Sequence, residues 1–108
     1  MPLHVDQTNF EQEVLQSKKP VLVDFFATWC GPCRMLGPTI EEIEAERADV
    51  KVVKIDIDES PAIANAYRIS AVPSVFVFRN GKVAAQTMGV RPKDQLYRLI
   101  DIAMAKEL

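Results

Sequence analysis

The apolar positions of the chain follow two periods, one typical of strands and one typical of helices. Three runs rich in β-branched and aromatic residues, at 20–26, 50–57 and 74–78, predict strands, and the first is apolar on both faces as in a central strand. Between them, apolar residues recur every three or four positions. In the stretch from about 31 to 47, this period predicts a helix whose inward residues are Met35, Leu36, Ile40 and Ile43.

Start signals mark the other helices. Thr8 and Glu11 match a capping box and predict an N-terminal helix that begins at Thr8. Ser60 before Pro61 predicts a second helix, with Ser60 as its N-cap. A last helix is expected after 91–92, where apolar residues again follow the helical period.

Proline and glycine add two local predictions. Pro38 lies inside the long helix and removes the N–H that would bond the carbonyl of Arg34, so a kink is expected there. Asn80 and Gly81 both tolerate positive φ and predict a two-residue hairpin turn before a returning strand at 82–88.

The element order predicts the fold class. With a short strand at 3–5, the order is β-α-β-α-β-α-β-β-α. This alternation predicts an α/β fold, a mixed sheet of about five strands with four helices on both faces. No repeat or linker interrupts the chain, so we expect one domain over residues 1–108.

The composition excludes several classes of function. The chain carries 13 basic and 15 acidic residues spread along its length, which gives no electrostatic case for binding nucleic acid or an anionic membrane. No apolar run approaches the ~18 residues of a membrane span, and the N-terminus lacks the pattern of a signal peptide. We therefore expect a cytoplasmic protein, and we expect it to be a monomer.

The two cysteines carry the most specific chemical signal. Cys30 and Cys33 are the only cysteines, and their spacing brings two sulfurs within disulfide reach at one helix turn. Cys30 comes directly before the predicted helix, where free N–H groups favour a thiolate. We therefore expect a switchable dithiol in which Cys30, as the more exposed sulfur, is the nucleophile and Cys33 resolves the mixed disulfide.

Two other interpretations of the cysteines are weaker. A structural disulfide would close so short a loop that it would remove little chain entropy, and such disulfides are rare in the cytosol. A zinc site would have only His4 besides the two thiols, which is short of four ligands, so no metal is expected.

Asp24 is the most unusual residue outside this motif. It lies inside an apolar run, where burial raises the pKa of a carboxyl group. Such a group suits a proton acceptor for Cys33, and Lys54, on the polar phase of its own strand, is a candidate partner. The alternative is an aspartate that is satisfied by hydrogen bonds and has no catalytic role.

Together these residues resemble the thioredoxin family over essentially the whole chain. The resemblance is carried by the 23–25 run before Trp29-Cys30-Gly31-Pro32-Cys33, and by Pro38, Lys54, Val72-Pro73, Asn80-Gly81 and Gly89. Three departures from the common family pattern, Phe26, Arg34 and Ser74, leave the sulfur chemistry untouched but bear on partner choice.

The resemblance implies a reducing active site with a defined contact surface. Gly31 and Pro32 bring no charge to the thiolate, and Cys-Gly-Pro-Cys is the pattern of reducing members. By resemblance, the peptide bond before Pro73 is cis, and an apolar surface around Cys30 binds substrate. Its residues are Trp29, Pro32, Ala71, Val72, Pro73, Gly89 and Val90. The alternatives are that residues 71–73 form a plain loop and that Gly89 simply ends a strand.

The sequence analysis therefore predicts a protein-disulfide reductase and electron carrier. No phosphate-binding glycine loop is present, so we expect no nucleotide, flavin or other cofactor. The resemblance implies that a thioredoxin reductase recharges the chain and that disulfide-containing proteins are its substrates. One alternative is an oxidase or isomerase, and another is a binding module whose redox state only gates docking.

Overall fold

A five-stranded mixed sheet forms the centre of the computed structural model, which describes residues 1–107. The strand order is β1-β3-β2-β4-β5, in which β1, β3 and β2 are parallel and β4 and β5 are antiparallel. The strands are β1 (Leu3–His4), β2 (Val21–Phe26), β3 (Lys51–Asp56), β4 (Ser74–Arg79) and β5 (Lys82–Met88). The predicted strands and the predicted mixed sheet are confirmed, with ends that differ by one or two residues.

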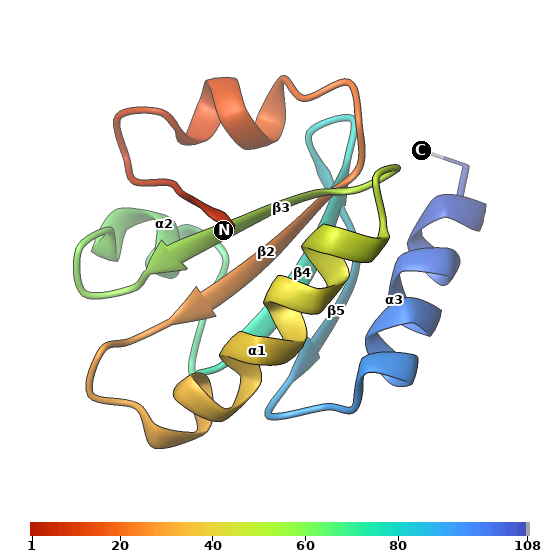
Figure 1. The fold of residues 1–108 in the computed structure, drawn as a ribbon. Helices are drawn as coiled ribbons and strands as arrows, with labels where there is room; N and C mark the ends of the chain where they lie inside the picture. The colour runs from red at the N-terminus through yellow and green to blue at the C-terminus, as the bar shows by residue number, and fades with distance from the viewer. Residues whose placement is uncertain (108) are drawn as a thin grey trace.

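Helices cover both faces of this sheet, as expected for the α/β class (Figure 1). Helices α1 and α3 lie on one face, whereas α2 and a short π-helical turn, η1, lie on the other. Their bounds are η1 (Glu11–Leu15), α1 (Gly31–Glu46), α2 (Pro61–Ala66) and α3 (Lys93–Ala105). Pro38 lies within α1, and a kink at this proline stays a prediction.

The sheet separates two hydrophobic cores, and β2 contributes to both. Leu22 packs with α1 and α3 on one face, and Val23 packs with the aromatic residues of β4 on the other. Both are fully buried. A strand with two buried faces favours apolar residues along its whole length, which explains the apolar run in the sequence. The carboxylate of Asp24 is the exception, and it is carried into the interior by this strand.

The hairpin turn between β4 and β5 has the expected geometry. Asn80 and Gly81 have φ angles of 52° and 77°, the left-handed values that a two-residue hairpin turn requires. A side chain at Gly81 would also meet the backbone oxygen of Leu15 at 3.2 Å. This position therefore requires glycine both for its φ angle and for the close approach of η1.

Three local predictions are wrong. The capping box at Thr8 does not form, because Asp6 accepts hydrogen bonds from the N–H and hydroxyl of Thr8 and organises the turn itself. Ser60 is the N-cap residue of α2, but its hydroxyl accepts no cap hydrogen bond. Met35 is exposed, although the helical period predicts that it points inward. Leu36 takes the inward position, and neighbouring residues of a helix point about 100° apart.

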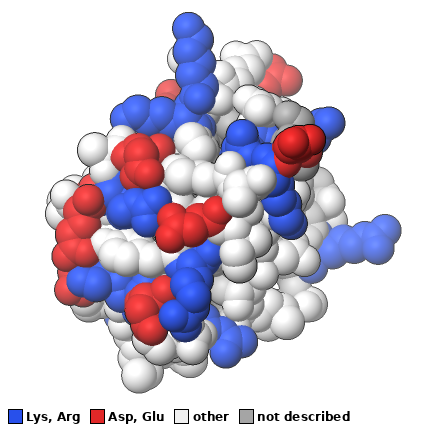
Figure 2. Space-filling view, turned by 90° about the vertical axis from the view of Figure 1, so that its right-hand side faces the viewer, with Lys and Arg blue, Asp and Glu red and all other residues white. Residues whose placement is uncertain are grey.

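The surface charges are mixed in sign. Figure 2 shows Lys and Arg side chains interspersed with Asp and Glu on the face that α3 presents. Part of this pattern is a set of ion pairs between α1 and α3. The Nζ of Lys93 lies 3.1 Å from Glu46 Oε2, and Nη2 of Arg47, at the end of α1, lies 3.2 Å from Asp101 Oδ1. Within residues 1–107, no helix combines the length and the apolar character that crossing a membrane requires.

Candidate functional site

Cys30 is placed at the N-terminus of α1 by the turn that follows β2. Its backbone is extended (φ −92°, ψ 111°), and α1 begins at the next residue. Its Sγ accepts a hydrogen bond from the backbone N–H of Cys33 at 3.1 Å. An N-cap sulfur therefore takes the place usually held by a Ser or Asp oxygen. The same N–H and the positive end of the helix favour a negative charge on this sulfur.

The two cysteines are joined in a disulfide, with their Cα atoms 5.3 Å apart. As whole residues they are 4% and 5% exposed in this oxidised form, and the greater exposure of the Cys30 sulfur stays a prediction. Both cysteines belong to a small apolar cluster with Ala27, and Phe26 and Val72 pack against this cluster. The two cysteines differ in their polar neighbours, since the Cys30 Sγ accepts the N–H of Cys33.

The loop before β4 lies directly against Cys30. The Sγ of Cys30 is 3.7 Å from the carbonyl oxygen of Val72, and the Val72–Pro73 peptide bond is cis, as the resemblance implied. The hydroxyl of Ser74 donates to the carbonyl of Ala71 at 2.7 Å, which fixes this turn. The structure thus brings residues 42 positions apart in the sequence to the same sulfur.

Gly89 connects this loop to the end of β5. Its N–H donates to the carbonyl of Pro73 at 2.8 Å. Its φ angle of 86° is left-handed, and a side chain there would meet nothing within 4 Å. Glycine is therefore explained by the backbone conformation, and its N–H holds the backbone of Pro73 close to the end of β5.

Trp29 and Asp58 form a contact that the sequence analysis missed. The Trp29 side chain is an exposed hydrophobic group, with 66% of the residue accessible, and its indole N–H donates to Asp58 Oδ2 at 2.7 Å. Asp58 follows β3 and Trp29 follows β2. Because these strands are parallel, the chain leaves both at the same end of the sheet. The predicted parallel pairing of the two strands could therefore have indicated that Trp29 and Asp58 lie close together.

Asp24 is fully buried, and within residues 1–107 neither of its carboxylate oxygens has a hydrogen-bond partner. Burial raises the pKa of Asp24 to about 6, while the positive charge of Lys54 acts to lower it. Within the described residues no protein group hydrogen-bonds to the Asp24 carboxylate, and the catalytic role of Asp24 stays a prediction. A carboxyl group with this pKa changes its protonation state near neutral pH.

Lys54 is paired with Asp24 in the sheet register but does not form an ion pair with it. Its Nζ lies 4.7 Å from the centre of the Phe26 ring, in a cation–π contact. Phe26, Lys54 and Cys33 also line one solvent-facing hollow of ≈ 360 Å³. The charge of Lys54 therefore acts to lower the pKa of Asp24. Lys54 and Cys33 also line the same solvent-facing hollow.

The described residues offer no other evident chemistry at this site. Within residues 1–107, no three His, Cys, Asp or Glu side chains gather as a metal site would require. The site combines a redox-active disulfide with an exposed apolar rim, and β2, which leads towards the disulfide, carries a buried acid.

Comparisons with known proteins agree with this geometry. Residues 1–102 match the family model described as Thioredoxin. Thioredoxin 1 of Synechococcus elongatus is 45% identical over 98 residues, which cover 90% of this chain and 92% of the relative. Thioredoxin of Rickettsia bellii is 46% identical over 102 residues (94% and 97%), and that of Griffithsia pacifica 49% over 90 residues (82% and 83%). The chain therefore belongs to the thioredoxin family, and its Cys30–Cys33 pair makes it a thiol-disulfide oxidoreductase of the protein-disulfide reductase type.

Proposed function

We propose that Cys30 is the attacking sulfur and that Cys33 is the resolving one. The reduced Cys30 thiolate attacks a disulfide of a partner protein, forms a mixed disulfide and expels one partner thiolate. Cys33 then loses its proton and attacks Cys30, which releases the second partner thiolate and leaves the Cys30–Cys33 disulfide. The observation that carries this assignment is the N-cap position of Cys30, where its sulfur faces the N–H of Cys33 at 3.1 Å.

The direction of this exchange is towards reduction of the partner. Gly31 and Pro32 hold the two cysteines in the first turn of α1 and bring no charge that would stabilise the thiolate further. A thioredoxin reductase would return two electrons to the chain after each cycle. We further propose that residues 1–108 act as a single domain, as a cytoplasmic monomer, without a bound cofactor.

The partner would bind on the rim around Cys30. Trp29 and Val90 are exposed apolar side chains, and Ala71, Val72, Pro73 and Gly89 form the adjoining backbone. A partner segment lying beside the Val72 backbone would bring its disulfide to Cys30, since the Val72 carbonyl lies 3.7 Å from that sulfur. We name Trp29, Ala71, Val72, Pro73, Gly89 and Val90 the contact surface.

Asp24 would accept the proton that Cys33 must lose. Its pKa of about 6 keeps it ionised at pH 7 and close enough to neutrality to exchange protons readily. Lys54 would assist by its charge, and the hollow that it shares with Cys33 gives solvent access on that side. Asp24 and Lys54 thus support the second step of the exchange and not the first.

An Asp24→Asn variant should form the mixed disulfide normally but resolve it slowly. We expect resolution at pH 7 to fall by roughly a hundredfold, because an amide accepts no proton, and this is the low end of general-base effects. The difference should shrink as the pH rises and the Cys33 thiol ionises on its own. Rapid-quench measurement of the mixed disulfide from pH 6 to 9 checks this, with Glu59→Gln as the exposed control. An equal resolution rate across the range would contradict the role of Asp24.

The overall proposal is tested by reduction of insulin disulfides with dithiothreitol as the electron donor. The intact chain should accelerate reduction well above dithiothreitol alone, because the dithiol is regenerated in each cycle. A binding module would show no acceleration, and replacing both cysteines by serine would leave its docking to partners intact. No acceleration by the intact chain would contradict the proposed function.

A further inference from the structure

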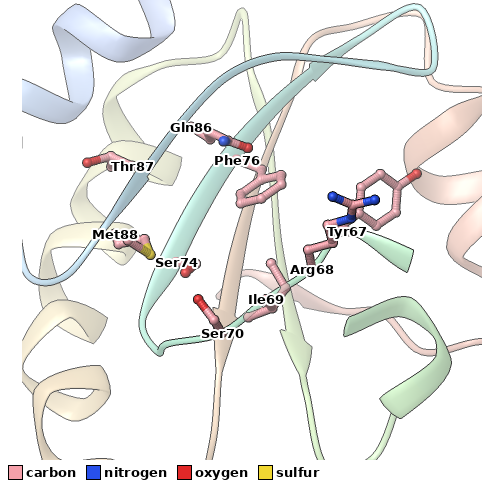
Figure 3. Close-up of a pocket in the computed structure, with 9 residues that line it drawn as sticks. All are labelled: Tyr67, Arg68, Ile69, Ser70, Ser74, Phe76, Gln86, Thr87 and Met88. Carbon is pink, nitrogen blue, oxygen red and sulfur yellow. The ribbon is translucent and has the colours of Figure 1, made fainter. Parts of the chain in front are cut away.

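A groove of ≈ 430 Å³ lies beside the contact surface, on the sheet face that η1 and α2 partly cover. The core on that face includes residues of β2, β3 and β4 but none of β5. Gln86 and Met88 of β5 pair with Phe76 and Ser74 of β4, so all four side chains lie on this face. Figure 3 shows the groove between β5 and the loop that follows α2, with Phe76 between the two walls.

The groove is continuous with the contact surface. Ser74 directly follows Pro73 and Met88 directly precedes Gly89, and the hydrogen bond from the Gly89 N–H to the Pro73 carbonyl joins the two strands at this point. Strand β4 then carries the floor of the groove away from Cys30. Phe76 is four residues beyond Val72, which corresponds to about 13 Å of extended chain. A partner segment on the contact surface can therefore reach the groove within a few residues of its disulfide.

Among residues 1–107, Arg68 is the only charged residue that lines the groove. It is exposed, and within residues 1–107 its guanidinium forms no ion pair or hydrogen bond. The described part of the chain places no carboxylate in the groove lining that would compete for this cation. The rest of the lining is apolar or neutral, and it includes Met88, which is 54% exposed. The groove is therefore suited to an apolar side chain next to a negative charge.

The backbone at Arg68 gives no reason for an arginine. Its φ angle is 55°, in the left-handed region, and it directly follows the turn that ends α2. Glycine or asparagine is the favoured residue in such a position, because a side chain with a Cβ is strained there. An arginine at a position that favours glycine is therefore better explained by its side chain than by the fold.

We propose that the groove recognises the substrate segment that flanks the reactive disulfide, and that it selects an apolar residue accompanied by an aspartate or glutamate. The apolar side chain packs between Phe76 and Met88, and the carboxylate pairs with Arg68. This proposal rests on the proposed function, since it requires that substrate binds at Cys30. Arg68 is a specificity-determining residue and takes no part in the sulfur exchange.

Symmetric disulfide-linked peptide dimers test this proposal, because attack on either sulfur gives the same products. Each peptide carries one cysteine and one leucine, and a Glu, Gln or Lys placed two to five residues from the cysteine on either side. The reduced chain is mixed with each dimer, and acid-quenched samples give the second-order rate constant for release of peptide thiol. At low salt, the best Glu peptide should react about threefold to fivefold faster than its Gln counterpart, with Lys slower still.

Two variants separate recognition from folding. Arg68→Gln should remove the preference for Glu, and Arg68→Gly should remove it as well while leaving the melting temperature at or above that of the parent. Arg98→Gln makes the same charge change on α3 and should keep the preference. High salt should weaken the preference for the Glu peptide in the parent protein, because salt screens the charge of Arg68.

The possible failures are distinguishable. Equal rates for the Glu and Gln peptides, with rapid reduction of both, would overturn the groove proposal and leave the proposed function standing. A preference for Glu that persists in Arg68→Gln would also overturn it. No reduction of any peptide would overturn the proposed function, and the groove proposal with it.

Discussion

The Cys30→Ser variant is expected to reduce protein disulfides no faster than dithiothreitol alone. A serine hydroxyl at an N-cap does not ionise near neutral pH and does not attack a disulfide, so the first step of the cycle is lost. The protein-dependent rate should fall by about a thousandfold or more, because the thiol that remains, Cys33, lies inside the first turn of α1 and lacks the N-cap position that favours a thiolate. Insulin reduction at matched protein concentrations measures this loss.

Cys33→Ser is the matched control, because it removes one sulfur from the same turn and should fail at a different step. Cys30 remains beside the α1 N-terminus and still attacks, but nothing resolves the product. The variant should therefore accumulate as a covalent one-to-one adduct with a protein disulfide substrate, visible on a non-reducing gel and by intact mass. If the adduct forms in Cys30→Ser and not in Cys33→Ser, the two roles are reversed.

Asp24→Asn is expected to stabilise the oxidised protein by about 3 kcal/mol at pH 7. The pKa of Asp24 is about 6 in the folded protein against an ordinary value of 3.8, and burial is the main cause. About two units of difference correspond to about 3 kcal/mol of unfavourable free energy when the group is ionised in both states. An asparagine at this position carries no charge to desolvate, so the variant avoids this term and should melt about 10–20 °C higher.

The stabilisation gained in Asp24→Asn should depend on pH, because the protonation state of Asp24 does. Below about pH 3.8, Asp24 is protonated in both states and contributes no difference. Between about pH 3.8 and 6, the folded protein holds a proton that the unfolded chain has lost, so stability falls as the pH rises. Above about pH 6 the full cost is present, and the gain from Asp24→Asn should be constant there.

Guanidinium unfolding of the oxidised protein and the variant from pH 3 to 8 measures this profile. The difference in unfolding free energy should be near zero at pH 3 and reach its maximum by pH 7. Glu59→Gln, an exposed change of the same kind, should show no comparable gain. A gain in Asp24→Asn that does not vary with pH would show that desolvation of the charge is not its cause.

The order of the elements and the identity of the reactive pair could be predicted from the amino-acid sequence alone. The unbroken apolar run of β2, the hairpin signal at Asn80–Gly81 and the cysteine spacing at a helix start are local features, and each is found in the structure as predicted. The burial of Asp24 could also be predicted, because a carboxylate inside such an apolar run cannot reach solvent. Local competition explains the failure at Thr8, because Asp6 accepts the Thr8 N–H that Glu11 would have accepted and also engages the Thr8 hydroxyl.

Which distant groups meet at the site depends on how the strands and helices pack together. The Val72 carbonyl at the Cys30 sulfur, the Trp29–Asp58 hydrogen bond and the Lys54 ammonium over Phe26 all depend on how the strands are ordered and registered. The groove at Arg68 arises likewise, because η1 and α2 leave β5 uncovered on their face. Periodicity along the chain determines which face of an element is buried, but contacts between elements depend on packing across the sheet, and a single sequence carries no direct signal of that packing.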